Sequence, residues 1–344
     1  MTVRVAEAFA PGRINLIGEH TDYNDGLALA FATTAGVSVR ARRLSGARVE
    51  ARAHDLGEEY SFDAHETGGA TGWRAYLHGA YAELRTLGYE PPPASIDISS
   101  QLPIGSGMAS SAALTLALCM ALVELSGDPA LPSLALARLA QTVEQVWAGA
   151  QTGLLDQLAS LHGADGQAVL IDFRELTLER MPLRLDGSTL VTLASGEVHT
   201  NSASGYNSRR AECTEAAHRM GVESLRDALI QDLHMLPDTL AARARHVISE
   251  NGRVLAAARA LRDGDLTLLG RLLDLTHASL RDDYEVSTPA VERTVDALKA
   301  AGAIGARLIG GGFGGSVIAL MPQGTVAPAG ATVISAGTGA HLLG

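Results

Sequence analysis

The segment 95–127 constrains the fold more than any other part of this 344-residue sequence. Residues 95–99 alternate as a β-strand does, 102–107 form a glycine-containing turn, and 108–125 are apolar enough to predict a long helix that ends before Gly127. A helix that starts directly after such a turn offers free backbone N–H groups to an anion, for example a phosphate. Ser110 and Ser111 add hydroxyl groups that can reach phosphate oxygens or a divalent cation. A tight turn that binds nothing has the same pattern, so this segment alone leaves both interpretations open.

The charged residues exclude several classes of protein. The formal net charge is −11, which argues against nucleic acid or an anionic membrane as the main partner. Lys299 is the only lysine and falls in an expected helix, 291–300, with no phosphate loop beside it. A Walker A loop and a protein-kinase core both need a lysine at the phosphates, so neither is present. An acidic chain that binds a nucleotide must therefore use arginine, backbone N–H groups or a metal ion.

The order of the remaining elements predicts an α+β protein with two domains. Strands are expected at 2–9 and 28–43 around a polar loop, 11–26, and a helix at 134–148 precedes a strand at 168–172. After this point helices dominate, at 208–220, 236–261 and 266–279, with strands at 190–194, 305–309 and 316–320. We place the boundary so that the domains are 1–178 and 179–344.

The two cysteines and the apolar segments indicate where the protein resides. Cys119 and Cys213 lack metal-ligand spacing and do not suggest a disulfide framework, which fits a reducing compartment. The start of the sequence lacks a secretory signal pattern, and the apolar run 112–123 is too short to span a bilayer. We therefore expect a cytoplasmic protein.

The segment 103–112 resembles the phosphate-binding motif of the GHMP kinases, which include galactokinase, homoserine kinase and mevalonate kinase. That family usually ends the motif Gly-Leu-Ser-Ser-Ser-Ala, whereas this chain has Ala109 at the first serine and keeps Ser111, the residue used near Mg²⁺. Residues 73–76 resemble a segment near the adenine in relatives. The resemblance implies that ATP is bound by Pro103, Gly105, Ser106, Gly107, Met108, Ala109, Ser110, Ser111 and Trp73.

The segment 11–26 is similar, almost residue for residue, to the signature of the galactokinases within that family. It places Glu19, His20 and Asp22 in a glycine-flanked loop, where carboxylates and an imidazole can pair with sugar hydroxyls. Taken alone, Glu19 and His20 would be interpreted as a solvated turn, but the length of the match favours sugar binding.

Three further segments extend the resemblance. By analogy with the family, 144–157 carries the catalytic carboxylate Asp156, the magnesium ligand Glu144 (with Ser111) and Gly153 beside the sugar, although Gln151-Thr152 stands where the family more often has Pro-Cys. The segment 204–213 implies that Tyr206 contacts the sugar, with glycine at 205 where the family commonly has Glu. The run 310–315 looks like the third GHMP motif, which closes over the phosphates and the sugar.

The resemblance implies a fold and a reaction. The fold would be the two-domain GHMP kinase architecture, with a ribosomal-protein-S5-domain-2-like N-terminal domain, a ferredoxin-like C-terminal domain and the active site between them. The reaction would be transfer of the γ-phosphoryl group of ATP to the C1 hydroxyl of galactose, with Mg²⁺ as cofactor. Arg13 would stand near the catalytic Asp156 and the γ-phosphate. Galactose and ATP are then the partners, and we expect a monomer or a weak homodimer.

Three alternatives remain open at this point. A kinase for N-acetylgalactosamine or arabinose would keep the same motifs, because a pocket enlarged near C2 is made by residues outside them. A non-catalytic galactose sensor is disfavoured, because such relatives lose the Ser-Ala pair of the phosphate motif. This chain keeps that pair at Ser111-Ala112, and it also keeps Arg13 and Asp156. A third alternative is a metabolite-binding partner subunit, but no feature of the sequence points to one.

Overall fold

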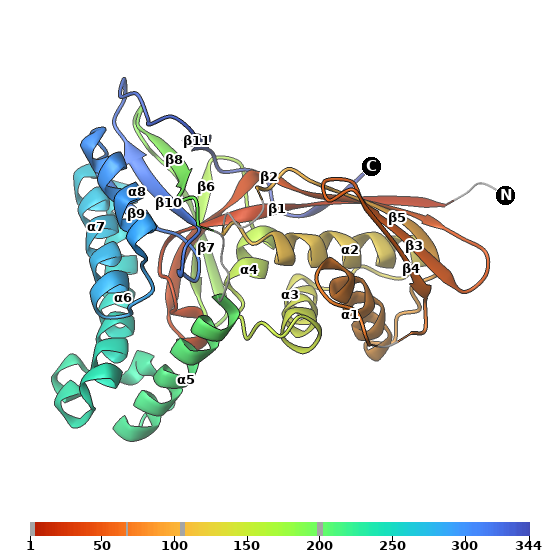
Figure 1. The fold of residues 1–344 in the computed structure, drawn as a ribbon, viewed down its shortest axis with the longest axis horizontal. Coiled ribbons are helices and arrows are strands. Elements are labelled where there is room, and N and C mark those ends of the chain that lie inside the picture. The colour runs from red at the N-terminus through yellow and green to blue at the C-terminus, as the bar shows by residue number, and fades with distance from the viewer. Residues whose placement is uncertain (1–3, 67, 104–106, 198–201) are drawn as a thin grey trace.

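The computed structural model describes residues 4–66, 68–103, 107–197 and 202–344, and its described part contains two separate β-sheets (Figure 1). The larger sheet has eight described strands, in which β12-β1-β2-β5-β3-β4 form the main path and β6 joins β2 to β7. All its pairs are antiparallel except β3 with β5. The strands are β1 (Val5–Ile17), β2 (Leu27–Arg43), β3 (Arg48–Ala53), β4 (Glu58–Asp63), β5 (Ala94–Ser100), β6 (Gln167–Asp172), β7 (Thr177–Pro182) and β12 (His341–Leu343).

Helix α2 (Ser110–Ser126) is the centre of the first unit. It packs on β1 and β2 and is covered on its other side by α1 (Trp73–Thr86) and α3 (Ser133–Thr142) (Figure 1). A helix enclosed between a sheet and other helices must be apolar all round, which explains why its sequence shows no polar face. The short helix α4 (Leu155–Leu161) packs beside it against the same two strands.

The second unit is an antiparallel sheet with helices against it. Its described strands run in the order β11-β8-β10-β9, which fits the expected ferredoxin-like half. They are β8 (Thr189–Ala194), β9 (Gly305–Leu308), β10 (Ser316–Met321) and β11 (Thr332–Ile334), and the helices are α5 (Ser202–Met220), η3 (Leu225–Asp227), η4 (Ile230–Met235), α6 (Asp238–Asp263), α7 (Leu266–Asp282) and α8 (Pro289–Ala300). The predicted α+β architecture of two units is therefore confirmed.

Two strands cross the division expected between the units. β7 lies across the 178/179 position and pairs with β6, and β12 pairs with β1, so residues 179–182 and 341–343 belong to the larger sheet. The division into 1–178 and 179–344 stays a prediction. Within the described part of the chain, no helix is both long and apolar enough to cross a membrane.

The expected loop at 11–26 is wrong in its first part. β1 continues through this segment to Ile17, and only residues 18–26 leave the sheet, through the short helix η1 (Asp22–Asn24). Pro11 sits at a register shift of the β1–β2 pair, where a missing N–H is tolerated. A Cβ atom at position 12 would lie only 2.7 Å from the carbonyl oxygen of Met108. Glycine is therefore needed here for close packing and not for a turn.

The expected helix at 134–148 also differs from the structure. It is α-helical only to Thr142 and continues as a π-turn, η2 (Val143–Trp147), in which the Ala148 N–H donates to the Val143 carbonyl at 3.3 Å. Such turns hold one extra residue in a helix and occur often at functional sites. Helix α5 begins before the expected residue 208, and helices α1 and α4 and strands β3, β4, β7, β11 and β12 were not expected.

Candidate active site

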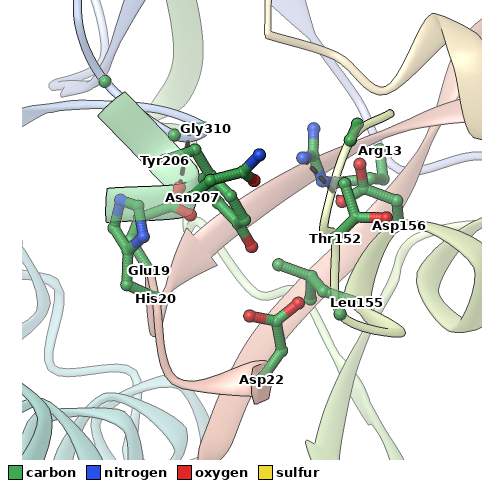
Figure 2. A pocket seen from close by; sticks show the side chains of 14 residues that line it. Arg13, Glu19, His20, Asp22, Thr152, Leu155, Asp156, Tyr206, Asn207 and Gly310 are labelled. Carbon is green, nitrogen blue, oxygen red and sulfur yellow. Dashed lines mark hydrogen bonds and ion pairs between the residues drawn. The ribbon is translucent and has the colours of Figure 1, made fainter. Parts of the chain in front are cut away.

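A cavity of about 220 Å³ lies where the two units meet (Figure 2). Its walls come from the end of β1, the turn after it, the start of α4, helix α5 and the glycine run after β9. Every residue expected to be catalytic or to bind the sugar lines this cavity: Arg13, Glu19, His20, Asp22, Gly153, Asp156 and Tyr206. The structure thus brings together residues from three distant sequence segments, while their roles remain predictions.

Arg13 and Asp156 form an ion pair on one wall of the cavity. The Arg13 Nη2 atom lies 2.7 Å from Asp156 Oδ1, and Arg13 Nη1 donates to the carbonyl of Gly107. The backbone N–H of Arg13 also donates to the Met108 carbonyl at 3.1 Å. Burial alone would lower the pKa of Arg13, but the carboxylates of Asp156 and Glu19 raise it, so the guanidinium stays charged. Arg13 therefore connects the cavity to the turn before α2.

Glu19 is fixed by groups from the second unit. Its Oε1 atom accepts hydrogen bonds from Arg307 Nη2 at 3.0 Å and from the Gly310 N–H at 2.9 Å. Arg307, on β9, is fully buried and also donates through Nε to the Leu16 carbonyl at 2.9 Å. The carbonyl of Glu19 lies 3.1 Å from Nε2 of His246, on α6. The Arg307 guanidinium and the Gly310 N–H hold the Glu19 carboxylate at the cavity wall, and His246 contacts the Glu19 backbone.

His20 belongs to a buried chain of hydrogen-bonded hydroxyl groups. Its Nδ1 atom lies 2.8 Å from the Tyr23 hydroxyl, which lies 2.9 Å from the Tyr284 hydroxyl. Burial, and then the nearby His246, lowers the pKa of His20 well below its ordinary value, so the imidazole is neutral. The ring of Tyr206 lies 5.3 Å from that of His20, centroid to centroid, which puts two rings on this side of the cavity.

Asp22 explains why position 153 must be glycine. A Cβ built on Gly153 would overlap the Oδ2 atom of Asp22, so a side chain here would displace the carboxylate. Burial, the nearby Asp156 and then Glu19 raise the pKa of Asp22 to about 7. Asp22 is thus a carboxyl group that changes its protonation near neutral pH.

A second cavity of about 290 Å³ lies at the start of α2. It is mainly apolar and is lined by Trp73 and Tyr76 of α1, by Leu102, and by Ser110 and Ser111. Of the other residues expected to bind ATP, Gly107 accepts a hydrogen bond from Arg13 through its carbonyl, and Ala109 has a left-handed backbone (φ 59°) directly before α2. The side chain of Met108 is buried and that of Pro103 is exposed. Gly105 and Ser106 lie outside the described residues.

Glu144 lies between the two cavities. Its Oε1 atom accepts a hydrogen bond from Ser111 Oγ at 2.5 Å, and its Oε2 atom accepts from Thr152 Oγ1 at 2.9 Å and from Gln157 Nε2 at 2.7 Å. Burial, and then the charge of Asp156, raises the pKa of Glu144 to about 7. A buried carboxylate of this kind is suited to a cation, which would offset the cost of its burial.

The pair of Ser111 and Glu144 fits magnesium in its chemistry. Mg²⁺ prefers oxygen ligands and is commonly held by one or two carboxylates together with substrate phosphates and water. Within the described ranges there is no cluster of three or more His, Cys, Asp or Glu residues that would bind a metal without help. A site here would therefore need the nucleotide to complete it.

Sequence reasoning did not assign roles to several residues at the site. Arg307 could have been noticed as a charged residue inside an expected apolar strand, which requires a buried partner. Asn207 and Thr152 line the first cavity, but no sequence signal distinguishes them from neighbouring polar residues. The structure explains the glycine at position 205, because a Cβ there would lie 2.6 Å from the ring of Phe313.

The sequence matches three family descriptions in the order of the chain. Residues 4–43 match the galactokinase galactose-binding signature, 75–164 the GHMP kinases N terminal domain and 257–337 the GHMP kinases C terminal domain. The chain is 41% identical to a galactokinase from Thermotoga neapolitana over 316 residues, which covers 92% of this chain and 89% of that protein. It is 42% identical to a galactokinase from Mycobacterium tuberculosis over 320 residues, covering 91% and 88%.

Solved structures agree with the sequence matches. The crystal structure of Lactococcus lactis galactokinase complexed with galactose is similar, with a TM-score of 0.91 and 33% identity over 99% of this chain and 95% of that one. Methanococcus jannaschii mevalonate kinase shares the fold, with a TM-score of 0.66 and 17% identity over 98% and 99%. The fold and the site between its two units define a GHMP kinase. Within that class, the chain belongs to the galactokinase family.

Proposed function

We propose that this protein transfers the γ-phosphoryl group of ATP to the C1 hydroxyl of galactose, giving galactose 1-phosphate and ADP. The observation that carries the proposal is the position of the Arg13–Asp156 ion pair. It lies on the wall of the first cavity, lined by Glu19, Asp22 and Tyr206, which we call the sugar cavity. The same guanidinium contacts the turn before α2 through the Gly107 carbonyl. A carboxylate placed there meets an acceptor hydroxyl beside the donor phosphates, as in-line transfer requires.

Sugar recognition would use the groups on the opposite wall. Glu19 and Asp22 supply carboxylate oxygens that accept hydrogen bonds from sugar hydroxyls, and the neutral His20 can donate or accept. Tyr206 offers a ring and a hydroxyl to one face of the sugar. Because the buried polar groups would be left unpaired by an analogue that lacks one hydroxyl, such a site discriminates strongly between sugars.

The chemical step would depend on Asp156 and Arg13. Asp156 would accept a hydrogen bond from the C1 hydroxyl and take its proton as the bond to phosphorus forms. Arg13 would hold that carboxylate in place and offset negative charge on the transferred phosphoryl group. Leaving ADP carries the electron pair of the broken bond between phosphorus and the bridging oxygen.

The nucleotide would occupy the second cavity and the start of α2. Trp73 and Tyr76 form apolar walls suited to a purine, and Ser110 and Ser111 add hydroxyl groups to the same cavity. Ser111 and Glu144 would hold Mg²⁺, which supplies positive charge against the phosphate oxygens. This arrangement lets an acidic protein bind a polyphosphate.

We further propose a cytoplasmic protein that is a monomer or a weak homodimer. Cys119 and Cys213 are buried free thiols, which suits a reducing compartment where ATP is also available. Sedimentation equilibrium over a hundredfold range of concentration measures the oligomeric state, and a stable larger assembly would contradict this part of the proposal.

Turnover on a panel of sugars tests the function. The purified protein is incubated with ATP and MgCl₂, and ADP release is followed with galactose, N-acetylgalactosamine, arabinose, glucose and mevalonate, and with no acceptor. We expect strong preference for galactose, an acid-labile 1-phosphate product, and loss of turnover in excess EDTA. Preference for another sugar would refute the substrate, and binding of galactose and ATP without turnover would indicate a sensor.

A further inference from the structure

The segment that leads to the catalytic carboxylate has no regular secondary structure. We call residues 148–154, between η2 and α4, the strap. It supplies Ala150, Thr152 and Gly153 to the wall of the sugar cavity, and Asp156 follows in the first turn of α4. Inside the strap, the Thr152 N–H donates to the Ala150 carbonyl at 2.8 Å. One such turn does not fix a segment of this length, so its neighbours must hold it if the groups on it are to be positioned for catalysis.

Helix α5 of the second unit holds the strap from one side. Arg210 Nη1 donates to the Gln151 carbonyl at 2.7 Å and to the Thr152 carbonyl at 3.4 Å. Asn207 Oδ1 accepts from the Gln151 N–H at 3.3 Å. A proline at 151, the commoner residue in the family that the sequence resembles, would have no N–H to offer. The same helix carries Tyr206 into the sugar cavity, so one element contacts both the expected sugar site and the strap.

Arg210 also touches the sugar signature. Its guanidinium carbon lies 5.7 Å from the centre of the Tyr23 ring, and Tyr23 bonds to His20. This distance is within the range of a cation–π contact. Arg210 therefore joins three parts of the cavity wall: helix α5, the turn after β1 and the strap.

Thr152 connects the strap to the phosphate side. Its hydroxyl donates to Glu144 Oε2 at 2.9 Å, and Glu144 contacts Ser111 at the start of α2. Its carbonyl accepts from Gln141 Nε2 at 3.0 Å and from Gln145 Nε2 at 2.7 Å, in addition to Arg210. A hydroxyl is a better donor than the thiol that the family more often has at this position. Thr152 lines the first cavity and is thus linked to the second through Glu144 and Ser111.

We propose that Arg210 and Thr152 are positioning residues that couple the sugar site to the nucleotide site. The inference rests on the proposed function, since it takes galactose and ATP as the ligands of the two cavities. A sugar held against Tyr206 fixes α5, and Arg210 then fixes the strap. Thr152 in turn holds the Glu144 carboxylate where the nucleotide phosphates and their cation bind. Galactose should therefore tighten nucleotide binding, and by linkage the nucleotide should tighten galactose binding to the same degree.

Calorimetric titration of the full chain with ADP and MgCl₂ measures this coupling without turnover. The Kd of ADP is determined with and without saturating galactose, and the ratio of the two values is the coupling factor. We expect a factor of about fivefold or more for the wild type, within the usual range for coupled sites. Arg210→Met and Thr152→Val should each reduce it to below about twofold and lower kcat about tenfold, with a smaller change in the KM of galactose. Thr152→Ser, which keeps the hydroxyl, should retain the coupling.

The double variant and a matched control make the result specific. If both residues act through the strap, the double variant Arg210→Met/Thr152→Val should lose no more coupling than either single variant. Arg219→Met removes an arginine from the exposed side of the same helix, where it pairs with Glu215, and should behave as the wild type. If Arg210→Met unfolds, Thr152→Val still decides the question, because its side chain makes no contact with α5 among the described interactions.

Three outcomes would overturn the inference. Coupling that persists in Arg210→Met and Thr152→Val would show that the strap does not carry it. Losses that add in the double variant would show two independent routes. A wild type without coupling would refute the inference, and if that protein still phosphorylates galactose, the proposed function stands. Conversely, coupled binding without turnover on any sugar would refute the proposed function and leave the inference intact.

Discussion

Oε1 of Glu19 lies 3.0 Å from Nη2 of Arg307, in a pair that is almost completely closed off from solvent. The two residues come from opposite ends of the sequence, and the second also donates through Nε to the carbonyl of Leu16 at the end of β1. Two opposite charges buried together with their hydrogen bonds satisfied are tolerated, but either one left alone is costly. The pair therefore affects both the fold and the sugar site.

Arg307→Met should destabilise the protein and weaken galactose binding. Removal of the guanidinium leaves Glu19 as an unpaired buried carboxylate, which should lower the free energy of unfolding by about 3–5 kcal/mol. Urea denaturation measures the change. Arg262→Met is the control, because Arg262 and Glu179 form an exposed pair whose loss should cost less than about 1 kcal/mol. Equal effects of the two variants would contradict the importance of the buried pair.

Asp156→Asn should abolish most turnover while the protein stays folded. The amide has nearly the same shape but cannot accept the proton of the C1 hydroxyl, so kcat should fall by about 10²- to 10⁴-fold. ADP release measures turnover, and calorimetry should show galactose binding within a few-fold of the wild type. Arg13→Ala should lose turnover similarly, since Asp156 then loses its 2.7 Å partner. A variant at either position with wild-type kcat would refute these assignments.

Asp22 should make stability depend on pH below neutrality. Its pKa is raised to about 7 in the folded protein, mainly by burial, whereas an unfolded chain has the ordinary value. Its contribution to stability is thus fully present below the unfolded value and is lost as the pH rises through about 7. Asp22→Asn should then gain stability relative to the wild type between pH 4 and pH 8, by roughly 1–3 kcal/mol.

Comparison of the two proteins isolates this one group. Glu144, whose pKa is also raised to about 7, is present in both and largely cancels from the difference in unfolding free energy. Urea denaturation at several pH values gives that difference. A difference that is constant with pH would mean that Asp22 ionises normally, and one that falls with pH would reverse the sign of the shift.

Gly153→Ala should damage galactose binding more than folding. The new methyl group would overlap Asp22 Oδ2 and displace the carboxylate, so the KM of galactose should rise about tenfold or more. Gly252→Ala, inside helix α6 with open space around the added methyl group, is the matched control. It should raise stability by about 0.5–1 kcal/mol and leave kinetics unchanged. Similar kinetics for both variants would show that Asp22 does not contact the sugar.

Much of the fold was predictable where a pattern was both long and local. The apolar run that became α2 and the alternating strands β2 and β5 were expected within two residues at each end. Loop and strand were confused at 11–17, because Pro11 and Gly12 are typical of turns, whereas Gly12 packs closely against Leu102 and Met108, far away in the sequence. Strand β12 could not be predicted, because it forms by pairing with the edge of β1, which is more than 300 residues away in the sequence.

The candidate site divides in the same way. Arg13, Glu19, His20, Asp22, Gly153, Asp156 and Tyr206 were found through motifs and converge on one cavity. Arg307, Asn207 and Arg210 act through contacts to residues far from them in sequence, such as Glu19 and Gln151, and a single sequence carries no record of these distances. Gly205 departs from the family pattern, and the reason lies in a distant residue, because the ring of Phe313 occupies the space that a side chain at 205 would need.

The π-turn that ends the helix after Thr142 makes the spacing of this segment sensitive to length. A π-turn holds one residue more than the α-helix it interrupts. Deleting one residue from 145–148 would remove this extra residue, so the turn would close as an ordinary α-helix and the chain between Glu144 and Thr152 would be one residue shorter. Glu144 would then lose its register with Thr152 and Gln157. Natural variation in this family should therefore tolerate substitutions here far better than insertions or deletions.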